Sequence, residues 1–142
     1  MDVHSDTAHG RPRAVMRWAM AAFFIAGFAA HLYAAPSFEK IVPDWVPFPR
    51  AAVLLTGVVE LIGAIALLTP RFRWCAGVAL AVYVLAVWPA NMKHAFMHIE
   101  VPHIPDSWWY HGPRLALQPV IAWWALFCAG VVDWPFRREN KP

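Results

Sequence analysis

The sequence predicts an all-α fold, a bundle of four transmembrane helices with the N- and C-termini in the cytoplasm. Three observations lead there. Of the 142 residues, 60% are hydrophobic and only 15% are charged, and the mean hydropathy is +0.44. The apolar residues fall into four long windows, and basic residues gather in alternate connections. A soluble domain of this size needs more surface charge to stay dispersed, so the composition indicates a membrane protein with one domain.

Each apolar window is 17 or 18 residues long, close to the ~20 residues that a helix needs to cross ~30 Å of hydrocarbon. Backbone polar groups in lipid must be hydrogen-bonded within the segment, so all four windows are predicted to be helical. We expect a membrane domain over residues 14–136, with helices at about 14–35, 50–69, 73–97 and 114–134.

The segments around these helices carry weaker signals. Residues 1–13 have no apolar period and are predicted to form a disordered tail, and residues 137–142 form a basic tail. Only TPRFR separates the second helix from the third, so these two should be antiparallel neighbours. Pro89 and Pro119 are expected to bend the third and fourth helices near their outer ends.

The two connections expected on the outer side share a pattern. The first reads VPDWVPFPRAAVLL and the second IPDSWWYHGPRLAL. Proline is favoured in the first helical turn, where its missing N–H is not needed. The pairs Pro49-Arg50 and Pro113-Arg114 are therefore predicted to begin the second and fourth helices. The likeness of the two loops is typical of either an internal repeat or convergent loop chemistry.

The orientation follows from the basic residues, which the positive-inside rule places in the cytoplasm. They occur before the first helix, between the second and third, and after the fourth, which are the three segments on one side of a four-span chain. This predicts a multi-pass cell membrane protein, in the inner membrane if the cell is bacterial, with the lipid bilayer as partner. The sequence has no basic stripe with spaced aromatic residues, which is the pattern that would indicate a nucleic-acid partner. The basic residues that lie in the three segments on the cytoplasmic side are Arg11, Arg13, Arg17, Arg71, Arg73, Arg137, Arg138 and Lys141.

Glu60 is the deepest polar residue of the expected bundle. It lies ten residues after Arg50, which at 1.5 Å per residue is ~15 Å into the membrane. Gly57 and Gly63 share its helix face and permit close helix contact, so Glu60 is predicted to point into the bundle. Burial favours the neutral carboxyl, which can donate a hydrogen bond or pass a proton.

Every other helix also contributes a polar residue to the outer half. His31 lies near the end of the first helix and Asn91 near the end of the third, while Arg114 and Gln118 lie one turn apart on the fourth. Because polar groups are costly in lipid, we expect a site with Glu60 and His31 as its reactive groups and with the other three as ligand-binding groups. The alternative is that these residues hold the helices together or that Arg114 anchors a lipid headgroup.

The outer histidines form a separate candidate site. His94 and His98 are spaced i, i+4, which can chelate a metal ion, and His103 and His111 in the next segment could add ligands. The alternative is a water-facing histidine pair. The two cysteines, Cys75 and Cys128, lie toward the cytoplasmic side and form no CxxC motif, which indicates helix packing rather than thiol chemistry.

The chain resembles the DoxX family of small four-helix membrane proteins. The matching stretches are AGFAAHLYAAPSFEKIVPDWVP, GVVELIGAIALLTPRFR, the PAN of WPAN, and RLALQ before a Trp-rich helix; they cover most of residues 26–125. The resemblance implies a four-helix membrane fold and a link to respiratory or sulfur-redox membrane complexes. The recurrent polar positions of the family fall on His31, Glu60, Asn91, Arg114 and Gln118. The histidine-rich stretch after Asn91 departs from the family, and the cysteine pair of its related redox branches is not matched.

Three functions are consistent with these residues. The first is a quinone-handling subunit of a membrane oxidoreductase, with Glu60 as proton carrier and His31 as its hydrogen-bond partner. The sequence has no haem, flavin or iron–sulfur motif, so electrons would come from a redox partner protein. The second is a non-catalytic accessory or assembly subunit. The third is an outer-face metal-binding protein that uses His94 and His98, and transport of a lipid or small molecule also stays open.

Overall fold

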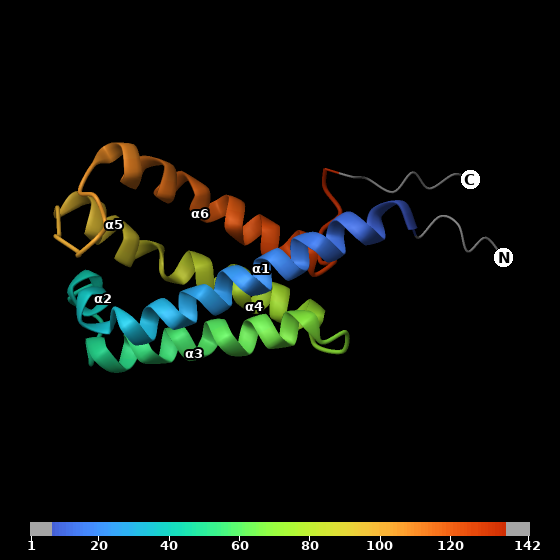
Figure 1. Ribbon diagram of the computed structural model, residues 1–142, viewed down its shortest axis with the longest axis horizontal. Coiled ribbons are helices and arrows are strands. Elements are labelled where there is room, and N and C mark those ends of the chain that lie inside the picture. Colours follow the sequence, from blue (N-terminus) through green and yellow to red (C-terminus); the bar gives the residue numbers. More distant parts are fainter. Residues whose placement is uncertain (1–6, 136–142) are drawn as a thin grey trace.

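The structure is a computed structural model that describes residues 7–135. Within that range the regular secondary structure consists of helices joined by loops, with no β-strand. The helices are α1 (Thr7–Tyr33), α2 (Ala35–Ile41), α3 (Pro49–Leu68), α4 (Arg73–Ala86), α5 (Trp88–Phe96) and α6 (Trp108–Cys128). Figure 1 shows α1, α3 and α6 as long rods, with α4 and α5 in succession forming another and the short helix α2 at one end of the molecule.

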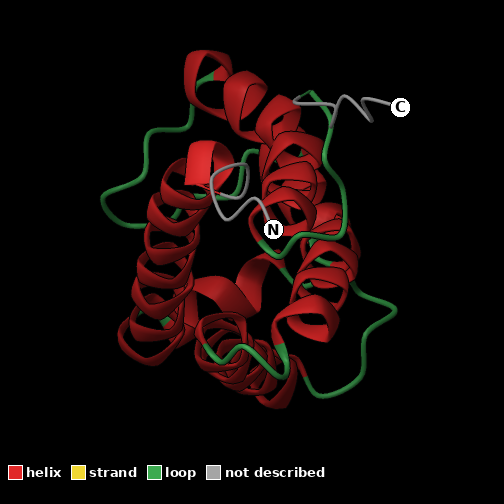
Figure 2. Ribbon diagram, turned by 90° about the vertical axis from the view of Figure 1, so that its right-hand side faces the viewer, coloured by secondary structure: helices red, strands yellow, loops and turns green. Residues whose placement is uncertain are grey.

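The rods pack in a closed ring. Helix α1 contacts α3, α3 contacts α4, α4 contacts α6, and α6 returns to α1. Figure 2, which looks along the bundle, shows the helices arranged around a common centre. The turn at residues 69–72 places α3 and α4 side by side and antiparallel, as the short TPRFR connection predicts.

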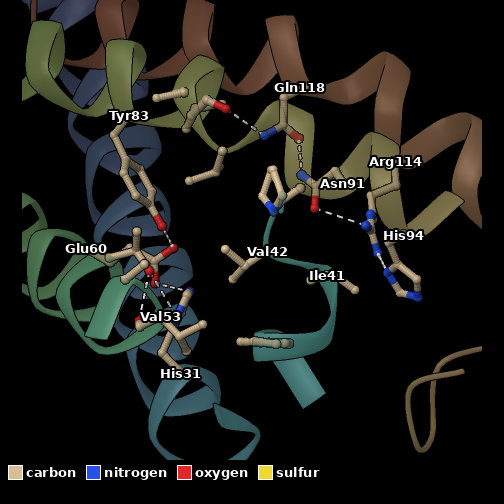
Figure 3. A pocket seen from close by; sticks show the side chains of 18 of the residues that line it. His31, Ile41, Val42, Val53, Glu60, Tyr83, Asn91, His94, Arg114 and Gln118 are labelled. Carbon is tan, nitrogen blue, oxygen red and sulfur yellow. Dashed lines mark hydrogen bonds and ion pairs between the residues drawn. The ribbon is translucent and has the colours of Figure 1, made fainter. Parts of the chain in front are cut away.

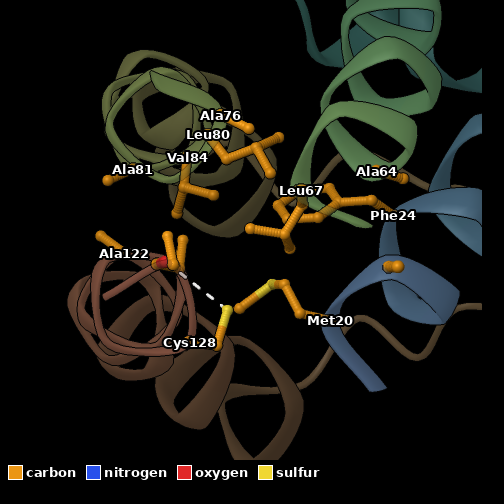
Figure 4. Packing of buried hydrophobic residues seen from close by; sticks show 13 residues of the cluster. Met20, Phe24, Ala64, Leu67, Ala76, Leu80, Ala81, Val84, Ala122 and Cys128 are labelled. Carbon is orange, nitrogen blue, oxygen red and sulfur yellow. Dashed lines mark hydrogen bonds between the residues drawn. The ribbon is translucent and has the colours of Figure 1, made fainter. Parts of the chain in front are cut away.

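The two ends of the bundle differ in content. The start of α1, the α3–α4 turn and the end of α6 lie at one end in Figure 1, while α2, α5 and the following loop lie at the other. A tight apolar core fills the first end (Figure 4), with Met20, Phe24, Leu67 and Leu80 at most 1% exposed. Cys128 packs in this core as predicted. The second end is hollow and holds the candidate site.

Three helical segments are long and apolar enough to cross a membrane: Gly10–Tyr33, Pro49–Leu68 and Arg73–Phe96. Helix α6 is less apolar because it carries Arg114, Gln118, two prolines and several tryptophans. Many outward-facing aliphatic side chains of the bundle are exposed, such as Leu55, at 64%. Contiguous apolar surface of this kind suits contact with lipid and is costly in water.

Helix α1 begins earlier than predicted. Residues 7–13 are helical, so the prediction of a disordered tail is wrong for them; residues 1–6 and 137–142 lie outside the described part of the chain. A long-range contact explains the difference. Arg13 donates to Asp133 at 2.8 Å, and its guanidinium lies 4.7 Å from the centre of the Phe127 ring. Such tertiary contacts leave no apolar periodicity in the sequence.

Helix α6 begins and ends about one and a half turns earlier than predicted. Ser107 caps its N-terminus by accepting a hydrogen bond from the backbone N–H of Trp109 at 3.3 Å, and this cap takes the place of the Pro113 start signal. Gly130 ends the helix with a φ of +80°. Val131 N–H then donates to the Leu126 carbonyl at 2.9 Å and Gly130 N–H to Phe127 at 3.0 Å, which is the Schellman arrangement.

The predicted third helix, 73–97, is divided into α4 and α5 at Val87. Pro89 explains the break, because it has no N–H to donate to the carbonyl of Leu85 one turn earlier. Helix α2 was not predicted at all. It is only seven residues long and begins with Pro36 in its first turn, so its periodicity is too short to distinguish it from a loop.

Candidate functional site

A cavity of about 560 Å³ occupies the hollow end of the bundle, which is a typical size for a small-molecule site. All six helices contribute to its lining. Its walls are mostly apolar, and its polar side chains include all five residues that the sequence predicts for the bundle site (Figure 3). The five are His31, Glu60, Asn91, Arg114 and Gln118, and the lining also contains Thr56, Tyr83, His94 and Tyr110.

Glu60 on α3 is buried, with 8% of its surface exposed. The hydroxyl of Tyr83, on α4, donates a hydrogen bond to Glu60 Oε1 at 2.8 Å. Glu60 Oε2 is buried without a hydrogen-bond partner, although His31 Nε2 lies 3.8 Å away. A buried carboxyl oxygen without a partner is unfavourable, so this atom is free to bind a ligand.

His31 on α1 is held in one orientation by α3. Its Nδ1 lies 2.8 Å from the carbonyl of Val53 and 3.3 Å from Thr56 Oγ1. A carbonyl can only accept, so Nδ1 carries a hydrogen. The Thr56 hydroxyl donates to the same carbonyl at 2.8 Å. In neutral His31 the other nitrogen, Nε2, therefore carries no hydrogen, and its lone pair is directed at Glu60.

The pair formed by Glu60 and His31 can hold a proton. Glu60 Oε2 and the lone pair of His31 Nε2 are 3.8 Å apart, and a proton on either atom removes the repulsion between them. The proton faces the cavity in both states. The pair can therefore donate a hydrogen bond to a ligand acceptor, or exchange a proton with it.

A chain of hydrogen bonds runs along the opposite wall. Arg114 Nη2 donates to Asn91 Oδ1 at 2.9 Å, Asn91 Nδ2 donates to Gln118 Oε1 at 3.1 Å, and Gln118 Nε2 donates to the Val84 carbonyl at 2.7 Å. Val84 lies in the last turn of α4, where carbonyls have no partner within the helix. The chain therefore ties α6 to both α5 and α4.

Arg114 brings a positive charge to this wall. Its Nη1 donates to His94 Nδ1 at 3.1 Å, and its Nε is buried without a partner. No carboxylate among the described residues forms an ion pair with it. A partly buried guanidinium with neutral neighbours is well suited to bind an electronegative ligand oxygen.

The cavity thus has two polar poles. Figure 3 shows His31, Glu60 and Tyr83 on one side, and Gln118, Asn91, Arg114 and His94 on the other. Aliphatic side chains such as those of Val42 and Ile41 lie between the two groups. One pole can hold a proton and the other carries a permanent cation, which favours a ligand with an acceptor at each end of an apolar body.

Helix α2 and the segment after it cover one side of the cavity. Lys93 on α5 ties this segment down, because its Nζ donates to the carbonyl of Val42 and to Asp44 Oδ1, both at 2.7 Å. Lys93 is thus a bridge between α5 and this cover.

The outer histidines have different partners, and the metal site at His94 and His98 stays a prediction. His94 is buried and accepts from Arg114, whereas His98 is exposed and bonds to Asp106 at 3.1 Å. Within residues 7–135, no group of three or more histidine, cysteine, aspartate or glutamate side chains is arranged to hold a metal ion. The i, i+4 spacing does not place His94 and His98 on one helix face, because α5 ends at Phe96 and His98 lies beyond it with a φ of +48°.

The sequence reasoning missed Tyr83 and Thr56. Each is a single hydroxyl residue in a long apolar helix, and neither the spacing nor the composition separates such a residue from the core. Two facts taken together could have indicated Tyr83. It lies on the helix expected to pack beside that of Glu60, and a buried tyrosine hydroxyl needs a hydrogen-bond partner.

The chain belongs to the family of a domain of unknown function, DUF8561, whose family model matches residues 19–129. This match covers α2 to α6, most of α1 and every residue that lines the cavity. No curated protein matches the chain, and no solved structure matches it. The family description names no activity and does not bear on the resemblance to the DoxX family.

Proposed function

We propose that this protein is a four-span membrane protein that binds a lipophilic quinone in the cavity and exchanges protons with it. The observation that carries the proposal is the two-pole cavity. A para-quinone has a flat apolar ring with a carbonyl oxygen at each end, so one oxygen accepts the proton held by Glu60 and His31 and the other accepts from Arg114. The mostly apolar lining suits the ring and its tail.

The proton pair gives the site its chemistry. Reduction of a quinone to a quinol takes up two electrons and two protons, and oxidation releases them. Glu60 and His31 hold one proton next to the ligand and stabilise its transfer. The electrons come from a redox partner protein, which agrees with the membrane redox complexes that the DoxX resemblance implies.

The proposal includes a topology. The less apolar helix α6 crosses the membrane as the fourth span, shielded by its contacts with α1 and α4. The arginines at the packed end of the bundle then face the cytoplasm, in the inner membrane if the cell is bacterial, and the cavity opens toward the outer side.

Equilibrium binding of a quinone tests the proposal. The purified protein in nanodiscs is titrated with a short-tailed benzoquinone and with a naphthoquinone, and the bound fraction is separated and measured. We expect Glu60→Gln and Arg114→Gln each to weaken binding at least about tenfold, which corresponds to one strong hydrogen bond. Glu100→Gln, at an exposed loop carboxylate, is the matched control and should bind like the wild type. Equal affinity in all four proteins would refute the proposal.

A second candidate is a non-catalytic accessory subunit. The chain from Arg114 through Asn91 and Gln118 to Val84 favours it, since its members satisfy one another and hold three helices in register. Under this account Glu60→Gln lowers the yield of an intact complex and leaves quinone binding unchanged. The titration above therefore separates the two candidates.

A further inference from the structure

A second cluster of titratable side chains lies just outside the cavity wall. It comprises His94 on α5, His111 on α6, and Asp106 and His98 near the connecting loop. Asp106 Oδ1 lies 3.3 Å from His111 Nε2, and both Asp106 oxygens lie 3.1 Å from His98 Nδ1. The rings of His111 and His94 are 4.8 Å apart between centres.

The side chains of this cluster become more buried from His98 at the surface toward His94 at the cavity. The side chain of His98 is 60% exposed and that of Asp106 is 32% exposed, whereas that of His111 is 1% exposed. His94 is also buried, and it lines the cavity and accepts from Arg114. The cluster therefore connects water to the cavity through polar side chains alone.

The hydrogen positions leave an open acceptor in the middle. Asp106 accepts hydrogen bonds, so His111 Nε2 and His98 Nδ1 carry the hydrogens. His111 Nδ1 is then a lone pair, and it is buried with no hydrogen-bond partner. His94 Nδ1 accepts from Arg114, so neutral His94 carries its hydrogen on Nε2. His94 therefore has a donor and His111 a free acceptor in two neighbouring rings, and because no hydrogen bond joins the two nitrogens, a rotation of the rings has to bring them together.

We propose that His94, His111 and Asp106 form a proton path between the cavity and the water at the outer end of the bundle, with His98 positioning Asp106. This inference rests on the proposed function, since the cavity ligand supplies or takes up the proton.

Each step of the path forms one bond to hydrogen and breaks another. A proton from the cavity binds His94 Nδ1 in place of the hydrogen bond from Arg114. After the rings of His94 and His111 rotate toward each other, the Nε2 hydrogen of His94 passes to His111 Nδ1. The resulting imidazolium loses its Nε2 proton to Asp106, which delivers it to water. Rotation of the rings then restores the starting state. The groups that face the path are Arg114 and Tyr110 on α6, and the charge of Arg114 disfavours a proton that rests on His94.

The path is tested by the exchange of the His94 ring hydrogen with water. Protein with ¹⁵N-labelled histidine is studied by NMR in nanodiscs, and the His94 signal is assigned by its loss in His94→Gln. We expect Asp106→Asn and His111→Phe each to slow this exchange at least about tenfold, the lower range of a lost acid–base group. Asp106→Glu should restore it. His103→Gln is the control, since His103 is an exposed histidine of the same loop and should not alter the rate.

An unchanged His94 exchange rate in both variants would overturn the path, whether that rate is measurable or too fast to resolve. Quinone titration of the same variants separates this outcome from a failure of the proposed function. We expect Asp106→Asn to bind quinone like the wild type, because Asp106 does not line the cavity. Loss of the path with intact binding, and loss of binding with an intact path, are then distinct results.

Discussion

At the scale of single residues, two glycines of the bundle determine how closely α1 approaches α3. A Cβ atom at Gly27 would lie 2.5 Å from Glu60 Oε2, and one at Gly57 would lie 2.8 Å from the Cβ of His31. Both distances are shorter than real contacts allow. The two glycines therefore allow the carboxyl and the imidazole to meet, and each side of the pair depends on a glycine of the opposite helix.

Gly27→Ala should displace the Glu60 carboxyl and break its hydrogen bond to Tyr83. We expect a loss of about 1–3 kcal/mol in the free energy of unfolding in detergent, the usual cost of overpacking, together with weaker quinone binding. Gly10→Ala on the same helix is the control, because nothing lies within 4 Å of the added Cβ. Its stability should stay equal or rise by about 0.5–1 kcal/mol. Similar losses in both variants would show that the contact with Glu60 is unimportant.

At the scale of elements, α5 is the helix on which the hollow end of the bundle depends. It is separated from α4 by the break at Val87 and is attached to its neighbours by polar side chains. Asn91 joins it to α6, Lys93 joins it to the cover after α2, and His94 joins it to Arg114. The position of α5 therefore rests on these hydrogen bonds more than on the apolar core, which lies at the other end.

The bond between Asn91 and Gln118 can be measured by a double-mutant cycle. Each single change to alanine should lower the free energy of unfolding by roughly 1–3 kcal/mol, because the partner left behind is buried and unsatisfied. The double variant should lose less than the sum, with a coupling energy of about 0.5–2 kcal/mol. Additive losses would mean that the amides contribute independently, and that the chain across α6, α5 and α4 does not act as a unit.

The loop between α5 and α6 should respond to acid through Asp106. Partial desolvation raises the pKa of Asp106, but the hydrogen bonds and charges of His98 and His111 together outweigh it, so the net pKa lies below the ordinary value. A lowered folded pKa means that the stabilisation is present above the unfolded pKa and is lost as the pH falls through the folded one.

Hydrogen–deuterium exchange of residues 97–107 checks this expectation. Protection relative to Asp106→Asn should be largest near neutral pH and should vanish once the pH falls well below about 3.9, the ordinary pKa of aspartate. The Asn variant should show no such loss, since it cannot titrate. A protection difference that persists into strong acid would contradict the assigned role of the carboxylate.

At the scale of the whole molecule, the bundle has a filled apolar core at the end where α1 begins and where Arg71 and Arg73 lie, and it is hollow at the other end. This division predicts the topology, because the basic end belongs in the cytoplasm. In a Cys75→Ser background, His103→Cys should react with a membrane-impermeant maleimide added to intact cells, whereas Arg71→Cys should react only after lysis. Both positions are exposed, so burial does not explain a difference. The reverse pattern would overturn the orientation.

The sequence predicted the helical fold and most of the cavity for a physical reason. Glu60, His31, Asn91, Arg114 and Gln118 are costly in apolar helices, so their burial in a common site could be inferred from composition and spacing alone. What could not be inferred depends on contacts that sequence periodicity does not report. The helix over residues 7–13 is held by Arg13 and Asp133, and Tyr83 became part of the site only through its contact with Glu60.

The most direct test of the account is a native mass spectrum of the gently solubilised protein, released from detergent inside the spectrometer. We predict an added mass equal to one quinone on the wild type and on Glu100→Gln, and its loss in Glu60→Gln. A protein that carries no such mass in any variant, and that instead copurifies with a partner, would contradict quinone binding and support the accessory subunit.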